Sequence, residues 1–462
     1  MAGPNDLLVL SNRGPVSFGR DDDGNLRAKR GAGGLVVTLG PGAERDAALW
    51  LACAATPDDR EAARVGLAVP GRFRYQPVIV DSEDYQAYYD VVSNQTLWFC
   101  LHGLWDLPRR PRFDRHWWAA WPRFRAVNQQ IADAAADAAA PGATVLIHDY
   151  HLALVPKMLA ARRPDLRTAS FLHIPWCSPA ELSVLPDEVA ETVLAGLAGG
   201  GPCGFHSPRW AKAFDDCCQA LLGRTPATFV SPAATDADDL RVVAASEACQ
   251  QEYDRIDALA GDRTLIVRVD RMEPSKNVLR GFWAFDELLE ARADLRGRVT
   301  FAAMVYPSRL GLAEYQSYSQ ETQSLAARLN AKWSRPGWTP IVLDPIDNYP
   351  RSVAALRRSD VLLVNPVRDG LNLVAKEGPV VNDRDGTLVL SRQAGAWDEL
   401  QDHAIGINPF DVSATAAALG RAIDLPAPER AARAAGLREA ALAASPLGWF
   451  DDQLSKAALA ET

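Results

Sequence analysis

The feature that most constrains the fold of this chain is a regular alternation of short apolar runs with longer helical stretches. Each apolar run ends at a polar segment or at a loop that carries glycine or proline. Near-continuous apolar strands that alternate with helices are typical of parallel sheets covered on both faces. The expected strands are residues 7–13, 143–150, 168–174, 264–270, 299–305, 360–365 and 386–391, and the expected helices include 126–140, 152–163, 277–294 and 319–333.

The length of the chain predicts more than one domain. Its 462 residues exceed what one hydrophobic core normally holds, so we expect two domains of about 200 residues each. The segment 225–240 is rich in Pro, Thr, Ala and Asp and lies between two strand–helix series, which makes it the expected hinge. The predicted domains are an N-terminal domain over 1–235, a C-terminal domain over 236–440, and a final helix over 441–462 that crosses back to the first domain.

Charge and composition exclude several classes of partner. The formal net charge of −9 disfavours binding to nucleic acid or to an anionic membrane, although a local basic pocket for a small anion is compatible with it. No run approaches the roughly 20 apolar residues of a membrane helix, and the N-terminus lacks the pattern of a signal peptide. We therefore expect a cytoplasmic protein with small-molecule substrates, and the sequence leaves a homo-oligomer open.

Cysteine and histidine usage gives no sign of disulfides or metal. The seven cysteines are scattered without a CxxC pair, which indicates reduced thiols. His148 and His151 are three residues apart, but no Cys, His or Glu partner stands at metal-ligand spacing beside them. We expect no metal site and no cofactor.

The polar chemistry gathers where the predicted strands end. The strand tails read SNR, HDYH, HIPW, RVDR, PSR and PVRDG. Ligands of parallel α/β sheets bind just beyond the carboxyl ends of the strands. These tails therefore define the expected site. A lone histidine such as His173 is by itself more often a packing residue than a catalytic one.

Three segments suit a phosphorylated sugar ligand. The glycine run RGAGGL (30–35) can turn backbone amides toward a phosphate, although a surface loop explains such a run equally well. Arg271 and Lys276 flank a helix start and can hold a diphosphate, with a salt-bridged turn as the alternative. Asp369 closes a strand, and Glu377 follows it in a helix, where a carboxylate can accept both hydroxyls of a ribose or hexose.

Taken together, these segments resemble one family. The motifs SNR, AGGL, YYDVVSNQTLW, HDYHL, FLHIPW, RVDRMEPSKN, YPSR, RDGLNLVAKE, VLSRQAGAWDEL and INPFD follow in the order of the trehalose-6-phosphate synthase family, from residue 11 to residue 411. That family consists of retaining glycosyltransferases (GT20) of the GT-B type, with two Rossmann-like α/β domains whose parallel sheets face each other across a cleft. The resemblance implies transfer of glucose from UDP-glucose or GDP-glucose to glucose 6-phosphate, and ADP-glucose is a further candidate donor.

The resemblance also implies a role for each matched residue. The acceptor phosphate would be held by Arg13, Tyr89, Trp98 and Arg309. Near the reacting centre, Asp149 and His173 would contact sugar, and Arg271 and Lys276 would neutralise the leaving diphosphate. The donor would be bound by Gly34, Asp369, Asn372, Leu373, Val374 and Glu377.

Some positions depart from the family pattern and keep other functions open. Cys53 in LWLAC stands in place of an aromatic residue near the acceptor, and SPAATD replaces the usual turn between the domains. One alternative is a pseudoglycosyltransferase that joins aminocyclitols through nitrogen. The other is a catalytically silent sugar-phosphate sensor, against which the retention of both leaving-group cations argues. The mechanism that the resemblance favours is a front-face transfer without a carboxylate nucleophile, unlike that of two-carboxylate hydrolases.

Overall fold

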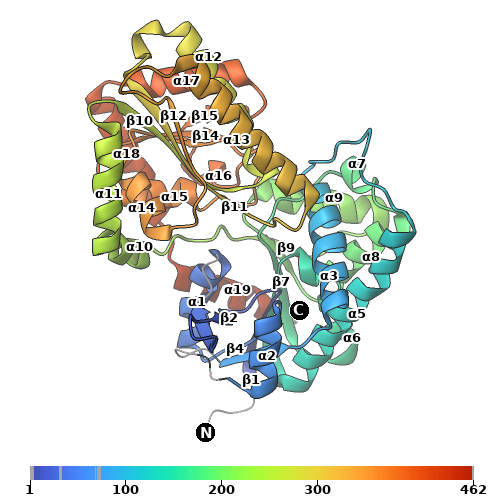
Figure 1. Ribbon diagram of the computed structural model, residues 1–462. Coiled ribbons are helices and arrows are strands. Elements are labelled where there is room, and N and C mark those ends of the chain that lie inside the picture. Colours follow the sequence, from blue (N-terminus) through green and yellow to red (C-terminus); the bar gives the residue numbers. More distant parts are fainter. Residues whose placement is uncertain (1–4, 31–33, 68, 70–73, 460–462) are drawn as a thin grey trace. The chain divides into compact units, whose positions relative to one another are not determined.

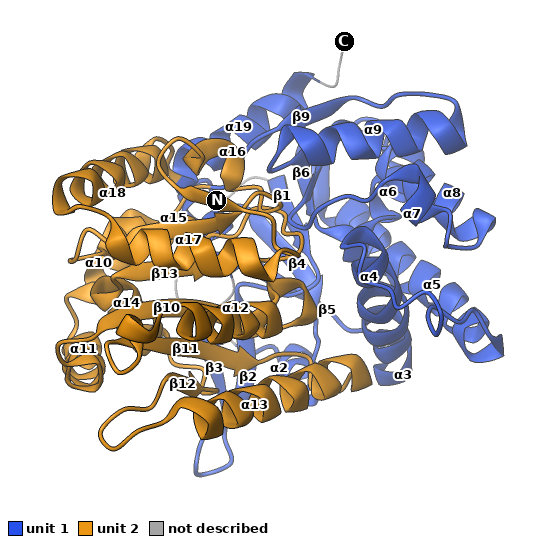
Figure 2. Ribbon diagram, turned by 90° about the horizontal axis from the view of Figure 1, so that it is seen from above, with its two compact units in different colours: residues 1–233, 446–462 blue, residues 234–445 orange. Residues whose placement is uncertain are grey.

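A computed structural model describes residues 5–30, 34–67, 69 and 74–459 of the chain. It divides into two compact units, residues 1–233 with 446–462 and residues 234–445 (Figure 2). The domain boundaries predicted from the sequence are residues 235 and 440. The glycine run 30–35 lies partly outside the described residues, because 31–33 are not among them.

The first unit is built on a parallel sheet of seven strands in the described chain, in the order β5-β4-β1-β6-β7-β8-β9. Its strands β1, β4, β7 and β9 are labelled in Figure 1. An antiparallel hairpin, β2–β3, follows the first strand. The strands are β1 (Asn5–Ser11), β2 (Val16–Arg20), β3 (Leu26–Arg30), β4 (Leu49–Cys53), β5 (Arg74–Val78), β6 (Ala139–His148), β7 (Arg167–Leu172), β8 (Cys203–Phe205) and β9 (Thr228–Val230).

Helices connect these strands, and the last helix of the chain also belongs to this unit. They are α1 (Gly34–Arg45), α2 (Pro57–Val65), α3 (Ser82–Gln86), η1 (Ala87–Leu97), α4 (Trp98–Leu101), α5 (Arg115–Ala138), η2 (Tyr150–Leu152), α6 (Val155–Arg162), α7 (Pro179–Leu182), α8 (Asp187–Leu197), α9 (Pro208–Leu222) and α19 (Pro446–Ala458).

The second unit has a parallel sheet in the order β12-β11-β10-β13-β14-β15. With the strands numbered in chain order, this is the 3-2-1-4-5-6 strand order of dinucleotide-binding folds. The side of the sheet to which successive strands are added changes at the first strand, β10. The strands are β10 (Thr264–Met272), β11 (Val299–Pro307), β12 (Ile341–Asp344), β13 (Val361–Val364), β14 (Thr387–Ser391) and β15 (Ile405–Ile407).

The helices of this unit cover its sheet. They are α10 (Ala237–Ala244), α11 (Glu247–Ala260), η3 (Pro274–Lys276), α12 (Val278–Ala291), η4 (Ala293–Leu295), α13 (Ala313–Trp333), α14 (Tyr349–Arg358), α15 (Val374–Val381), α16 (Trp397–Leu400), α17 (Val412–Asp424) and α18 (Ala427–Leu442).

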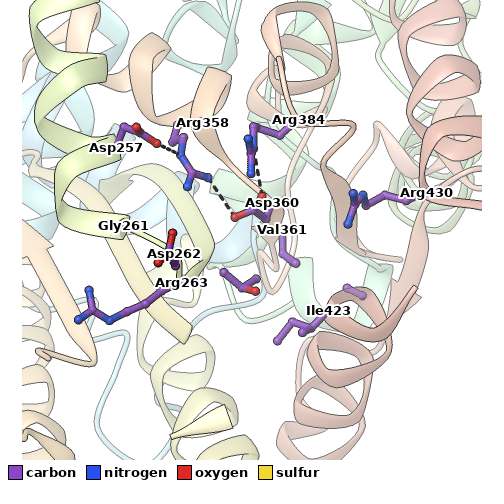
Figure 3. A pocket seen from close by; sticks show the side chains of 12 residues that line it. Asp257, Gly261, Asp262, Arg263, Arg358, Asp360, Val361, Arg384, Ile423 and Arg430 are labelled. Atoms are coloured by element: carbon purple, nitrogen blue, oxygen red, sulfur yellow. Dashed lines mark hydrogen bonds and ion pairs between the residues drawn. The ribbon is translucent and has the colours of Figure 1, made fainter. Parts of the chain in front are cut away.

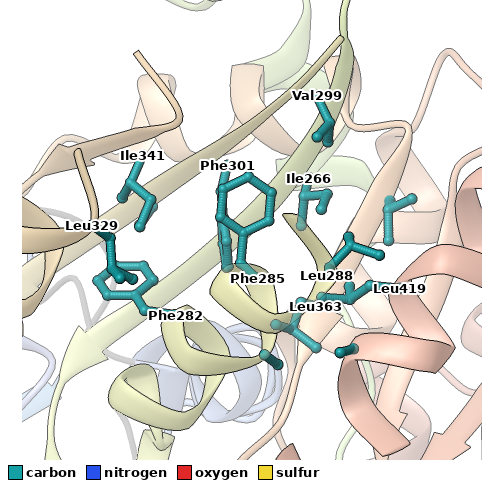
Figure 4. Packing of buried hydrophobic residues seen from close by; sticks show 14 of the residues in the cluster. Ile266, Phe282, Phe285, Leu288, Val299, Phe301, Leu329, Ile341, Leu363 and Leu419 are labelled. Carbon is teal, nitrogen blue, oxygen red and sulfur yellow. The ribbon is translucent and has the colours of Figure 1, made fainter. Parts of the chain in front are cut away.

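Aromatic and aliphatic side chains lock α12 onto this sheet. Phe282 and Phe285 of α12 meet the ring of Phe301 on β11 edge-on, at centroid distances of 5.4 and 5.5 Å (Figure 4). All three rings are buried, and replacing one such phenylalanine by alanine costs about 3–5 kcal/mol. This packing gives the loop between β10 and α12 a rigid base.

One helix of the first unit has an unusual pitch that its own side chains explain. Segment η1 is a π-helix, in which backbone amides donate to carbonyls five residues earlier rather than four. The side chains of Ser93, Asn94 and Thr96 donate to the carbonyls five residues earlier, at 2.7, 2.8 and 2.8 Å. Asn94 also accepts from the Tyr150 hydroxyl at 2.7 Å, which ties η1 to the loop after β6.

The predicted α/β class with parallel sheets is confirmed, and each predicted strand overlaps an observed one. No helix in the described part of the chain is both long enough and apolar enough to cross a membrane. All seven cysteines are free and buried.

Candidate functional site

The central strand of the second unit ends in an ordered polar loop. Arg268, fully buried, donates to the Asp270 carboxylate at 3.0 Å and to the backbone carbonyl of Lys276 at 2.5 Å. The guanidinium therefore fixes the turn between β10 and α12 from inside. Asn277 begins α12 with a φ of 62°, and its side chain donates to the carbonyls of Asn365 and Pro409.

Lys276 joins this loop to the loop that follows β13. Its Nζ lies 2.6 Å from Asp369 Oδ2 and 4.0 Å from Asp270 Oδ1. Burial alone would lower the pKa of Lys276, but the two carboxylates together raise it above its ordinary value. Burial raises the pKa of Asp270 despite the nearby cations. The ammonium group is therefore held in its charged form at the carboxyl edge of the sheet.

Two arginines share one buried carboxylate. Glu273 is 1% exposed, and its Oε1 lies 2.9 Å from Arg271 and 3.9 Å from Arg309, and also accepts from the Ser308 hydroxyl. Burial opposes ionisation, yet the cations Arg271, Arg309 and Lys276 lower the pKa of Glu273 to about 2. Arg309 has a φ of 47° and donates to the Tyr315 hydroxyl at 2.5 Å. Since the Arg271 side chain is 45% exposed, its outer edge is open to a ligand.

The loop after β13 leads the chain into α15. Asn372 adopts a φ of 78°, a left-handed conformation that asparagine tolerates, and donates to Asp369 Oδ2 at 3.1 Å. Leu373 precedes the helix and Val374 begins it, and the amides of the next three residues donate to the carbonyls of Asn372 and Leu373. Glu377 lies one turn further on, half-buried, and burial together with the charge of Asp239 raises its pKa to about 7.

In the first unit, three predicted site residues and the neighbouring His151 form one cluster. The Arg13 guanidinium lies over the Tyr89 ring at 5.6 Å, and that ring stacks on His151 at a centroid distance of 5.6 Å. His151 Nδ1 is 3.9 Å from Asp149 Oδ2. Asp149 has a φ of 74° at the end of β6, and its carboxylate accepts from the Tyr150 amide. Arg13 is exposed, so its charge is presented to solvent.

His173 has neighbours on both ring nitrogens. Its Nε2 lies 3.1 Å from His148 Nδ1, and its Nδ1 lies 3.3 Å from His206 Nε2. Burial lowers the pKa of His173 to about 3 and that of His148 well below its ordinary value. The ring is therefore neutral at physiological pH, and it lies just beyond β7, beside the carboxyl ends of β6 and β8.

The remaining two predicted residues of this unit lie outside the cluster. Trp98 is 2% exposed and packs on Phe99 and His102, at centroid distances of 5.1 and 4.2 Å. Gly34 is exposed and begins α1. Cys53 is buried at the end of β4, and burial raises its pKa to about 12.

Sequence reasoning missed four side chains of these clusters as functional residues. Asp270 and Glu273 lie within RVDRMEPSKN, and the alternation of acidic and basic residues in that segment could have indicated them as functional residues. His148 opens HDYH and had been considered only as a metal ligand. His206 follows β8, a three-residue strand that the sequence did not reveal.

A polar pocket of about 480 Å³ lies at the opposite edge of the second sheet, where β10 and β13 begin (Figure 3). Arg358 is 3% exposed there and pairs with Asp257 and Asp360. None of the predicted site residues lines this pocket. Among the described residues, no group of three or more His, Cys, Asp and Glu side chains is placed to hold a metal ion.

Comparisons with known proteins point to one family. The model of glycosyltransferase family 20 matches residues 5–458. The trehalose-6-phosphate synthase of Mycolicibacterium smegmatis is 34% identical over 468 residues, covering 96% of this chain and 90% of that protein.

Solved structures agree in fold along the whole chain. The E. coli structure described as bound with UDP-2-fluoro glucose has a TM-score of 0.86 at 28% identity and covers 98% of both chains. An α,α-trehalose-phosphate synthase from Burkholderia xenovorans in complex with glucose-6-phosphate has a TM-score of 0.82 at 28% identity, covering 98% of this chain and all of that one. The chain therefore belongs to glycosyltransferase family 20 and is a glycosyltransferase of the GT-B fold.

Proposed function

We propose that this protein transfers glucose from a nucleotide-glucose to glucose 6-phosphate and forms α,α-trehalose 6-phosphate with retention of the anomeric configuration. The observation that carries the proposal is the cation cluster at the carboxyl ends of β10 and β11. There Arg271, Lys276 and Arg309 converge on buried carboxylates next to Asp369. The relatives that are named trehalose-6-phosphate synthase support the same reaction.

The second unit carries the groups expected for the donor. As the glycosidic bond breaks, negative charge builds on the departing diphosphate, and fixed cations stabilise it where it develops. Arg271 and Lys276 are assigned this role. Asp369 and the 372–374 segment would bind sugar and phosphate, and Glu377 would accept the ribose hydroxyls. The E. coli relative bound with UDP-2-fluoro glucose favours a UDP-glucose donor, with GDP-glucose and ADP-glucose as the alternatives.

The first unit carries groups expected for the acceptor. Arg13 is a cation at the end of β1, and Tyr89 stacks beside it with a hydroxyl that can donate to a phosphate oxygen. The B. xenovorans relative in complex with glucose-6-phosphate supports that acceptor. Trp98 of this unit and Arg309 of the second unit complete the proposed acceptor set, and Gly34 would present a backbone amide to the donor phosphate.

The proposed step balances without a cofactor. The bond between the donor's anomeric carbon and its diphosphate oxygen breaks, and the C1 hydroxyl oxygen of glucose 6-phosphate bonds to that carbon on the same face. The leaving diphosphate accepts the hydroxyl proton. Asp149 and His173 would contact the sugars as positive charge develops on the donor ring. Because Arg271 and Lys276 supply the charge that a divalent cation supplies elsewhere, turnover is expected without one.

A panel of UDP-, GDP- and ADP-glucose tests the proposal. Release of nucleoside diphosphate is measured with glucose 6-phosphate, with glucose, with an aminocyclitol phosphate, and with no acceptor. We expect release to depend on glucose 6-phosphate and on one preferred base. Release with an aminocyclitol phosphate alone would favour the pseudoglycosyltransferase, and binding without release would favour the sensor.

A further inference from the structure

Three histidines from three neighbouring strand ends form a continuous row in the first unit. His148 ends β6, His173 follows β7, and His206 follows β8. The contacts run from His148 Nδ1 to His173 Nε2 at 3.1 Å and from His173 Nδ1 to His206 Nε2 at 3.3 Å. Parallel pairing of β6, β7 and β8 brings the three side chains together. The row ends at the backbone of Ala233, whose amide donates to His206 Nδ1 at 3.2 Å.

That backbone amide determines where each proton lies. A backbone N–H can only donate, so His206 Nδ1 is unprotonated and its proton is on Nε2. His206 Nε2 then donates to His173 Nδ1, which places the proton of the neutral His173 ring on Nε2. His173 Nε2 in turn donates to His148 Nδ1. The opposite direction would set the Ala233 amide against a second N–H group.

At the other end of the row, no described group imposes the reverse order of hydrogen-bond donors and acceptors. His148 is fully buried, and its Nε2 has no hydrogen-bond partner among the described residues. Burial also opposes a charged ring at His148 and at His173, so a neutral row is favoured. The proton positions are therefore decided at the Ala233 end.

The indole of Trp449, from α19, covers the row. Its ring centroid lies 6.4 Å from His148, 5.9 Å from His173 and 6.4 Å from His206. The indole N–H donates to the Ser231 carbonyl at 2.9 Å, two residues before Ala233. The last helix thus holds both the rings and the segment that orients them.

We propose that His148 and His206 are positioning residues, and that the Ala233 amide acts through His206 to fix the ring of His173 as the Nε2-protonated tautomer. The hydrogen bond on one imidazole nitrogen selects the tautomer of the other. In this tautomer the Nε2–H of His173 donates to His148, which holds the ring in one orientation beside the place proposed for the donor sugar. The link to catalysis rests on the proposed function, whereas the tautomer does not.

Two substitutions of His206 separate the effect of the hydrogen-bond direction along the three histidines from the effect of their packing. In His206→Gln, the amide oxygen can accept from Ala233 and the amide nitrogen can donate to His173, so the direction is kept. His206→Leu removes both. Trp449→Phe is the matched control, because it removes the indole hydrogen bond and part of the cover without changing any group in the row.

The experiment combines nitrogen NMR with steady-state kinetics on the full chain. With ¹⁵N-labelled histidine, the seven histidines are resolved by long-range ¹H–¹⁵N correlations, which distinguish protonated from unprotonated ring nitrogens. We expect His173 to be Nε2-protonated in the wild type, in His206→Gln and in Trp449→Phe, and mixed in His206→Leu. We expect kcat to fall about tenfold in His206→Leu, the size of one hydrogen bond, with KM for the acceptor unchanged.

Each outcome decides the proposal. An Nδ1-protonated or charged His173 in the wild type overturns it, and this measurement does not depend on any variant folding. A mixed tautomer in His206→Leu with unchanged kcat removes the positioning role and leaves the proposed function intact. Absence of turnover with every nucleotide sugar contradicts the proposed function, while the NMR result still determines the tautomer of His173.

Discussion

At the scale of single residues, the buried carboxylates of the second unit order its cations. Glu273 is shared by Arg271 and Arg309, and Asp369 receives Lys276 and Asn372. Glu273, whose pKa the neighbouring cations lower, is ionised and holds them in place before any ligand arrives. Preorganised charge of this kind stabilises a transition state without reorganisation during the reaction.

Removing one leaving-group cation should slow the chemical step. We expect Arg271→Ala and Lys276→Ala each to lower kcat by roughly 10²–10³-fold, by analogy with the loss of one oxyanion donor, because the charge matters most as the diphosphate departs. Steady-state kinetics checks this. Arg255→Ala is the control, because that exposed arginine pairs with Glu252 on the surface of α11 and its loss should leave kcat unchanged. Near-normal turnover in both cation variants would refute the assignment.

Ionisation of Glu377 should make nucleotide binding depend on pH. Its pKa is raised to about 7, so the neutral acid dominates at pH 6 and the carboxylate at pH 8. Only the carboxylate can accept both ribose hydroxyls, and we therefore expect the affinity for UDP, GDP or ADP to rise about tenfold over this range. Titration calorimetry of wild type and Glu377→Gln measures the difference. An equal pH dependence in the variant would show that Glu377 does not contact the ribose.

At the scale of elements, the long strands could be predicted because they are continuous apolar runs. The segments β6, β10 and β11 were found in this way. The short strand β8 and the strand β4, which reads LWLAC, were missed because three to five residues carry too little pattern to separate them from loops or helices. The π-helix η1 was also missed, since its cause lies in side-chain bonds to carbonyls five residues back.

The candidate site could be predicted in part for a related reason. Strand ends gather at one edge of a parallel sheet, so Lys276 and Asp369 were expected near each other, and the structure brings them into contact. The contact of His173 with His148 and His206 depends on how β6, β7 and β8 pair, and no local pattern encodes that register. Glu273 was overlooked because its burial arises from packing between loops.

Close packing of two loops predicts the effect of one added methyl group. A Cβ at Gly395 would lie 1.9 Å from the Gly370 carbonyl oxygen, so the loop after β14 would be pushed from the loop that carries Asp369. We expect Gly395→Ala to cost about 1–3 kcal/mol in the free energy of unfolding and to lower kcat/KM. Denaturant unfolding measures the first effect. Gly311→Ala, where a Cβ meets nothing within 4 Å, should change neither quantity.

At the scale of the whole molecule, the buried histidines link stability to acid. Folding lowers the pKa of His148 and His173, so unfolding allows both rings to take up protons once the pH falls below about 6.5. The contribution of these two neutral rings to the free energy of unfolding is fully present above that pH. It is lost as the pH decreases, by up to about 2.7 kcal/mol per pH unit for two protons.

Thermal unfolding between pH 8 and 5.5 tests this linkage. We expect the midpoint to fall below pH 6.5 in the wild type and to fall less steeply in a His148→Gln, His173→Gln double variant. His116→Gln serves as the exposed control and should follow the wild type. A double variant with the wild-type slope would place the acid sensitivity in other groups.

Both units are proposed to serve one transfer reaction. We propose that the cations of the second unit stabilise a leaving diphosphate and that Arg13 and Tyr89 of the first unit hold a sugar phosphate, so a productive turnover would need both substrates. A protein that only bound sugar phosphates would need no leaving-group cations.

The most direct measurement follows the label from a ¹³C-glucose nucleotide donor by NMR, with glucose 6-phosphate and a metal chelator present. The account predicts that labelled glucose passes into an α,α-linked disaccharide phosphate, in step with one nucleoside diphosphate released. Label that stays in the donor, or that emerges only as free glucose, would contradict it.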